Sequence, residues 1–120
     1  MALHDTVVRR ITHWHEAQGD HVTAELRGYA KPPRCYGIRG RAYIPDVYVY
    51  DGRLAYEVKA YWAYRNSAPK LKAISESPKV SRLVLVLCTG TSGGISKVEG
   101  FLDREGVDCE VISFRDHPGW

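Results

Sequence analysis

The sequence predicts a single α/β domain with a mixed central β-sheet flanked by helices. The apolar run of residues 82–88 (RLVLVLC) has the composition of an inner strand that is covered on both faces. Asp51-Gly52 lies between two segments rich in Val, Tyr and Leu, which predicts a β-hairpin. Apolar residues recur at helical spacing over residues 5–18 and 95–105. Helices and strands that alternate in this way are typical of the α/β class.

The N-terminal half is predicted to contain one helix and three strands. In order, they are a helix over 5–18, a strand over 21–26, a loop over 28–41 and the two hairpin arms 42–50 and 53–61. Val7, Ile11 and His15 share one face of the helix, so His15 is expected at the edge of the core. Gly19 is expected to stop this helix.

The C-terminal half is predicted to continue with two helices and two strands. In order, they are a helix over 67–77, a strand over 82–88, a helix over 95–105 and a strand over 109–114. Pro69 fits the first turn of a helix and Pro78 follows its end, while Gly106 stops the next helix. The predicted order is therefore αβββαβαβ within one domain over residues 1–120.

Composition sets limits on the class of protein. The chain has 120 residues, a net charge of +3 and 44% hydrophobic residues, as expected for one globular domain. The longest apolar run is far too short to span a bilayer, so no membrane partner is expected. Cys35, Cys88 and Cys109 are odd in number and contain no CxxC motif, which argues against a disulfide framework or a zinc site. These features favour a cytoplasmic protein.

Positive charge is concentrated just before the hairpin. Residues 27–41 contain five basic residues and no acid. Such a segment is either a solvated loop or a binding surface for a polyanion. The predicted nucleic-acid contacts are Arg27, Lys31, Arg34, Arg39 and Arg41, with Lys70 and Lys72 further along the chain.

The hairpin brings two acids together. A two-residue type I′ turn at Asp51-Gly52 pairs Val49 with Leu54 and, further along the arms, Asp46 with Glu57. Side chains of directly opposed residues lie about 5 Å apart at Cβ. Because side chains alternate along a strand, Lys59 is expected on the same face as Glu57.

Two carboxylates at this separation need a shared proton or a cation between them. A divalent metal such as Mg²⁺ binds carboxylate oxygens and keeps positions open for water and phosphate oxygens. Lys59 could then hold the phosphate or stabilise the charge that develops on it. The alternative is a surface cluster in which Lys59 forms salt bridges with both acids.

The pattern Pro45-Asp46, ten residues, Glu57-Val58-Lys59 resembles the motif of the PD-(D/E)XK nuclease superfamily. The element order is similar to the core of that family, so the resemblance covers most of the chain. It implies a restriction endonuclease-like fold and a DNA endonuclease that depends on Mg²⁺ or Mn²⁺. It also implies that Asp46, Glu57 and the carbonyl of Val58 bind the metal and that Lys59 is catalytic. Small members of the family include archaeal Holliday junction resolvases and repair nucleases.

Family members often carry a further acid on the first helix. Asp5 is the candidate here, and Glu16 and Glu25 are the alternatives. The junction resolvases tend to have a polar Ser/Thr loop where this chain has the basic, proline-containing segment 31–34, which is a departure from that subfamily.

Two other functions fit parts of the sequence. A non-catalytic nucleic-acid-binding module could keep the nuclease fold without cleaving. Residues 88–94 (CTGTSGG) could bind a phosphate group, although they lack the GK[ST] ending of a nucleotide-binding loop, so no nucleotide cofactor is expected. A homodimer would let a protein this small cut two strands, but no interface is predicted.

Overall fold

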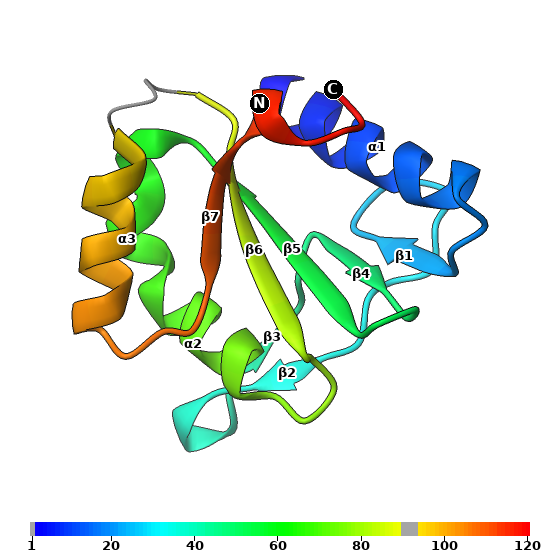
Figure 1. Ribbon diagram of the computed structural model, residues 1–120. Coiled ribbons are helices and arrows are strands. Elements are labelled where there is room, and N and C mark those ends of the chain that lie inside the picture. Colours follow the sequence, from blue (N-terminus) through cyan, green and yellow to red (C-terminus); the bar gives the residue numbers. More distant parts are fainter. Residues whose placement is uncertain (1, 90–93) are drawn as a thin grey trace.

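Five strands form the central sheet in the order β1-β4-β5-β6-β7 (Figure 1). The computed structural model describes residues 2–89 and 94–120. The strands are β1 (Val22–Ala24), β4 (Val47–Val49), β5 (Leu54–Lys59), β6 (Arg82–Leu87) and β7 (Glu110–Ser113). β1, β4 and β5 pair antiparallel, whereas β5, β6 and β7 pair parallel. The predicted mixed sheet is confirmed.

Helices cover both faces of this sheet. They are α1 (Ala2–Ala17), α2 (Ala68–Glu76) and α3 (Gly94–Arg104). Figure 1 shows α1 on one side of the sheet and α2 with α3 on the other. Each face has its own apolar core, and Val8 and Val58 belong to one while Leu71 and Leu85 belong to the other. The described residues therefore form a compact single α/β domain of three layers.

The inner strands explain why the sheet is stable. Five of the six residues of β6 are buried, which confirms the prediction from its apolar run. In β5, every residue from Ala55 to Val58 is buried, including the charged Glu57. The sheet thus places an ionisable side chain in its interior, where burial disfavours the charged form.

The hairpin has the predicted register but not the predicted turn. Val49 pairs with Leu54 and Val47 with Tyr56. A type I′ turn requires positive φ at both central residues, whereas here φ is positive at Gly52 (82°) and Arg53 (51°). The Asp51 carboxylate accepts a hydrogen bond of 2.8 Å from the backbone N–H of His21, which ties the turn to the start of β1.

The predicted loop over residues 28–41 is partly ordered. It contains β2 (Cys35–Tyr36), which pairs with β3 (Ala42–Tyr43) as a separate two-stranded ribbon around a short 3₁₀ helix, η1 (Ile38–Gly40). The predicted arm 42–50 is consequently split into β3 and β4. Pro45 lies at the break, where its missing N–H cannot contribute to a ladder of hydrogen bonds.

Short 3₁₀ helices follow two of the strands. They are η2 (Tyr61–Ser67), between β5 and α2, and η3 (Phe114–Asp116), after β7. The predicted strand 53–61 therefore ends earlier than expected, at Lys59. No helix among residues 2–89 and 94–120 has the length and apolar character needed to cross a bilayer.

Candidate active site

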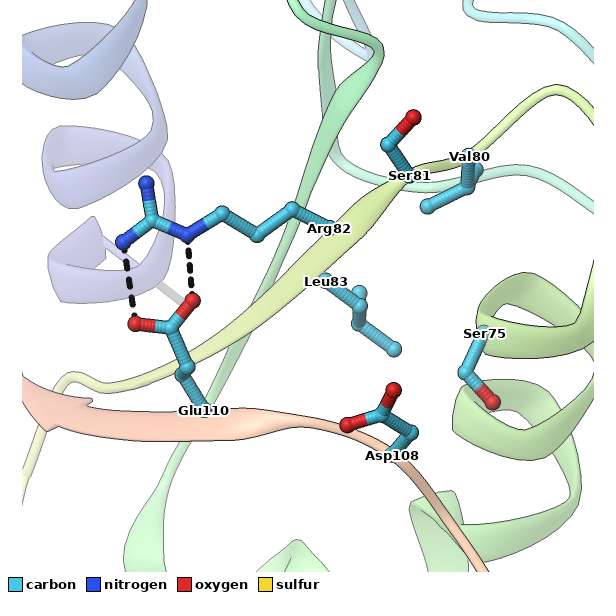
Figure 2. Close-up of a pocket in the computed structure, with 7 residues that line it drawn as sticks. All are labelled: Ser75, Val80, Ser81, Arg82, Leu83, Asp108 and Glu110. Atoms are coloured by element: carbon cyan, nitrogen blue, oxygen red, sulfur yellow. Dashed lines mark hydrogen bonds and ion pairs between the residues drawn. The ribbon is translucent and has the colours of Figure 1, made fainter.

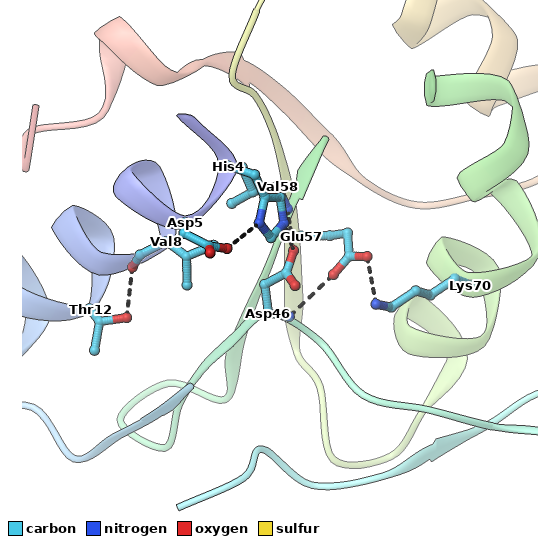
Figure 3. A network of polar contacts seen from close by, with 8 residues as sticks. All are labelled: His4, Asp5, Val8, Thr12, Asp46, Glu57, Val58 and Lys70. Atoms are coloured by element: carbon cyan, nitrogen blue, oxygen red, sulfur yellow. Dashed lines mark hydrogen bonds and ion pairs between the residues drawn. The ribbon is translucent and has the colours of Figure 1, made fainter. Parts of the chain in front are cut away.

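Asp46 and Glu57 meet at the edge between β4 and β5 (Figure 3). The backbone N–H of Asp46 donates a hydrogen bond of 3.2 Å to Oε1 of Glu57. The backbone N–H of Val58 donates one of 2.8 Å to Oδ2 of Asp46. Asp46 is 8% exposed and Glu57 1% exposed. The register of the hairpin thus brings the two acids together, and the structure adds that both are buried.

The two carboxyl groups differ in charge state. Burial, together with the nearby negative charge of Asp46, raises the pKa of Glu57 from 4.5 to about 8. Burial also disfavours the ionised form of Asp46, but hydrogen bonds from His4 and the Val58 N–H outweigh it and lower the Asp46 pKa. Without a metal, the surroundings of the pair therefore favour a proton on Glu57 over one on Asp46.

Two cationic side chains flank the pair from opposite faces of the sheet. His4, in the first turn of α1, places Nε2 3.3 Å from Oδ2 of Asp46 and Nδ1 3.0 Å from Oδ1 of Asp5. The hydrogen bond with Asp46 is the largest reason that the His4 pKa rises to about 9. On the other side, Nζ of Lys70 in α2 lies 2.7 Å from Oε2 of Glu57. That oxygen accepts no well-directed hydrogen bond from the described residues.

Lys59 lies at the end of β5 and is half-buried. Its backbone carbonyl accepts a hydrogen bond of 2.9 Å from Cys88. No ion pair or hydrogen bond of its ammonium group occurs within the described part of the chain, so Lys70, and not Lys59, is the lysine that contacts Glu57. The alternation along β5 still directs Lys59 toward the same face of the sheet as Glu57.

The three candidates for a further acid have different surroundings. Asp5 is exposed and connects to Asp46 only through His4. The Glu16 carboxylate accepts a hydrogen bond of 2.6 Å from the hydroxyl of Tyr29. Glu25 forms an ion pair with Lys31 at 3.6 Å. Of the three, Asp5 is the acid that belongs to the network around Asp46.

The predicted nucleic-acid contacts divide into exposed residues and residues with internal partners. All five basic residues of segment 27–41 are exposed: Arg27, Lys31, Arg34, Arg39 and Arg41. Lys72 is half-buried and lines a cavity of about 160 Å³ beside α2. Lys70 points inward to Glu57, as described above. Within the exposed set, Lys31 is paired with Glu25 and the Arg41 guanidinium lies 5.2 Å from the centre of the Tyr43 ring, but all five side chains remain accessible to a polyanion.

Other polar clusters are explained by structural roles. A small cavity of about 70 Å³ lies at the start of β6. Figure 2 shows the residues that line it, among which Arg82 forms two hydrogen bonds with Glu110. On the α1 face, His15 is buried and hydrogen bonds to Asp20 and Tyr56, each at 2.8 Å. His15 was predicted at the edge of the core, and its ring is buried there, 6% exposed. Each of these clusters uses its polar atoms within the protein.

His4 and Lys70 are the members of the network that sequence reasoning did not assign to it. His4 is adjacent to Asp5 in the chain, but only the packing of α1 places it against Asp46. Lys70 lies eleven residues after Lys59, the last residue of the motif. Only the docking of α2 on the sheet turns its side chain toward Glu57. The signals in the sequence were that His4 directly precedes the predicted first helix and that Lys70 lies in the first turn of the predicted helix 67–77.

No family model, no curated protein and no solved structure matches this chain. Within residues 2–89 and 94–120, no group of three or more His, Cys, Asp or Glu side chains is arranged to hold a metal ion. The predicted phosphate site at 88–94 falls largely on residues 90–93, which lie outside the described residues. The Asp46–Glu57 pair is thus the site that geometry singles out.

Proposed function

We propose that this chain is a cytoplasmic nuclease of restriction endonuclease-like fold that uses Mg²⁺ or Mn²⁺ to hydrolyse DNA phosphodiester bonds. The observation that carries the proposal is the buried Asp46–Glu57 pair, with Asp46 N–H 3.2 Å from Oε1 of Glu57. A globular protein rarely keeps two carboxyl groups together in a sheet interior, because the ionised pair is destabilising without a cation.

The donor set fits a hard divalent cation. Mg²⁺ retains several waters and needs only one or two carboxylates from a protein. Asp46, Glu57 and the carbonyl of Val58 would supply oxygen ligands, and Nζ of Lys70, 2.7 Å from Oε2 of Glu57, would have to move away from a metal bound at that oxygen. A metal bound there would lower the pKa of a coordinated water and so provide a hydroxide nucleophile at neutral pH.

The protein groups around the pair have separate tasks in this proposal. The Val58 N–H fixes Oδ2 of Asp46, so the orientation of that carboxylate is set by the β5 backbone. Lys59, whose ammonium has no ion-pair partner within the described residues, is available to bind the scissile phosphate and stabilise its developing charge. The exposed arginines of segment 27–41 would hold the DNA backbone, which favours selectivity for DNA structure or ends over base sequence.

A second candidate is a non-catalytic DNA-binding module with the same fold. The observation that favours it is the ion pair of Lys70 with Glu57 at 2.7 Å, together with His4 on Asp46. These two cationic groups already stabilise negative charge on the carboxyl pair without a metal. In this version of the function the network is structural and the exposed arginines alone are functional.

Metal-dependent cleavage and metal-dependent stability separate the two candidates. Purified protein is incubated with duplex, single-stranded, flap and four-way-junction DNA in Mg²⁺, Mn²⁺ or EDTA, and its thermal unfolding is followed with each metal. Under the nuclease proposal Asp46→Asn loses cleavage and loses stabilisation by Mg²⁺, because one ligand is gone. Lys59→Ala keeps the stabilisation but loses cleavage by about 10²-fold or more.

Asp51→Asn is the matched control, because it makes the same chemical change at an exposed position of the same hairpin. It should cleave and respond to Mg²⁺ as the wild type does. If the wild type and Asp46→Asn respond identically to both metals and no DNA is cut, the metal site is wrong. Retained DNA binding in that case supports the binding module.

A further inference from the structure

The ribbon β2–β3 stands apart from the central sheet. Figure 1 shows it below α2, with the tip η1 projecting from the lower edge of the molecule. Ile38 at this tip is 83% exposed and Tyr36 is 59% exposed. A single exposed aliphatic residue is ordinary on a protein surface, so its neighbours must decide whether it has a role.

The neighbours of Ile38 are basic. Residues 34–43 contain three arginines and no acid, and all three arginines are exposed. Arg39 has a φ of 68° and Gly40 one of 74°, so the chain reverses tightly next to Ile38, with Arg34 before it in the chain and Arg39 and Arg41 after it. An apolar tip surrounded by cations is complementary to nucleic acid, in which apolar base faces lie between phosphates.

The base of the ribbon is firmly held. Cys35 is fully buried in the core beneath α2. Nζ of Lys79 donates a hydrogen bond of 2.8 Å to the carbonyl of Arg34. At Gly37 a Cβ would lie 3.1 Å from the ring of Tyr43 and 3.3 Å from Ala73 of α2, so the backbone packs closely there. The tip is thus presented on a rigid support that shares α2 with Lys70 of the carboxylate site.

We propose that this ribbon is a wedge for duplex DNA. Ile38 inserts between adjacent base pairs from the minor groove, and Arg34, Arg39 and Arg41 bind the flanking phosphates. Apolar side chains inserted in this manner unstack a base step and kink the duplex. Because unstacking is easiest where pairing is already weak, the favoured substrates are duplexes with a mismatch, a nick or a branch.

This inference rests on the proposed DNA-cleaving function and adds its substrate class. The competing occupant of the tip is a second copy of the chain. Ile38 also lines a cavity of about 260 Å³ with Lys72 and Glu105, and an acid there could bind an arginine of another molecule. The excess of arginine over acid along the ribbon itself favours DNA.

The test uses duplexes that carry 2-aminopurine beside a mismatch or in a fully paired site, in EDTA so that cleavage does not interfere. The wild type should increase 2-aminopurine fluorescence on binding and prefer the mismatched duplex. Ile38→Ala should lose most of the fluorescence increase and about fivefold or more of that preference, with its salt dependence unchanged. Arg39→Ala should make the negative slope of log K against log salt less steep by about 0.9, because one phosphate contact is lost. It should keep the preference for the mismatched duplex.

Tyr50→Ala is the matched control, because Tyr50 is 43% exposed at the turn between β4 and β5, outside the ribbon. It should leave both measurements unchanged. Salt-dependent binding without any fluorescence increase overturns the wedge and leaves the nuclease proposal standing. A wild type that binds no DNA at all overturns both. If Ile38→Ala instead changes the mass measured by sedimentation and leaves DNA binding intact, the tip is a contact between copies and the wedge is wrong.

Discussion

Replacing Glu57 by Gln tests the buried carboxyl pair through the stability of the metal-free protein. The folded-state pKa of Glu57 is about 8 against an ordinary value of 4.5. The folded protein therefore retains a proton that the unfolded chain releases as pH rises above 4.5. Stability should accordingly fall as pH rises toward 8, in contrast to the usual behaviour of a salt-bridged acid.

The size of the effect follows from the shift. Each pKa unit corresponds to about 1.4 kcal/mol, so at pH 7 the wild type has lost about 3 kcal/mol relative to pH 4, and about 5 kcal/mol above pH 8. Gln is close in shape to the protonated acid and does not ionise. Glu57→Gln should therefore match the wild type near pH 4.5 and exceed its stability by about 3 kcal/mol at pH 7, a large part of the stability of a typical domain.

Urea unfolding in EDTA between pH 4.5 and pH 9 measures this difference directly. Glu110→Gln serves as the control, since Glu110 is half-exposed and paired with Arg82 at the surface. It should change the free energy of unfolding by less than about 1 kcal/mol at any pH in the range. A wild-type stability that is flat from pH 5 to pH 8, or a Glu57→Gln variant that keeps the wild-type slope, would refute a shared proton on the pair.

Three further predictions follow from other parts of the molecule. Joint replacement of Arg34, Arg39 and Arg41 by Ala should make the negative slope of log K for DNA binding against log salt less steep by about 3. Titration at several salt concentrations measures this slope. Burial, and then nearby His15, lowers the pKa of His117 from 6.5 to about 4. The His117 contribution to stability should therefore fall by about 1–2 kcal/mol as pH falls from 6.5 to 4, so the stability of the wild type relative to His117→Gln should fall by that amount; urea unfolding of both proteins decides, and a difference that stays constant over this range would exclude His117 as the cause. Gly94→Ala places a Cβ against the ring of Tyr61, closer than van der Waals contact allows, and should destabilise by about 1–3 kcal/mol, whereas Gly100→Ala meets nothing closer than 3.5 Å and should stabilise by up to about 1 kcal/mol; similar denaturation midpoints for the two would contradict the contact at Tyr61.

Local patterns in the sequence were sufficient to predict the three helices, the main strands of the central sheet and the register of the hairpin. The Asp51-Gly52 turn and the alternation of its arms fixed which residues face each other, because register in a hairpin depends only on residues close in the chain. The same reasoning applies to β6, whose apolar run required cover on both faces. These features are local, so one sequence is enough to predict them.

The contacts between distant elements were decided only by tertiary structure. His4 reaches Asp46 because α1 packs across one face of the sheet, and Lys70 reaches Glu57 because α2 packs on the other. His4 lies 42 positions from Asp46 in the chain, and Lys70 lies 13 positions from Glu57. No local pattern distinguishes His4 and Lys70 from the other charged residues of their helices. The β2–β3 ribbon was also missed, since its strands of two residues are too short for a periodic pattern and are held by the buried Cys35 and by α2. The sequence determined which acids would face each other across the hairpin, and the docking of the two helices decided which cations neutralise them, because that choice depends on which helix face meets the sheet.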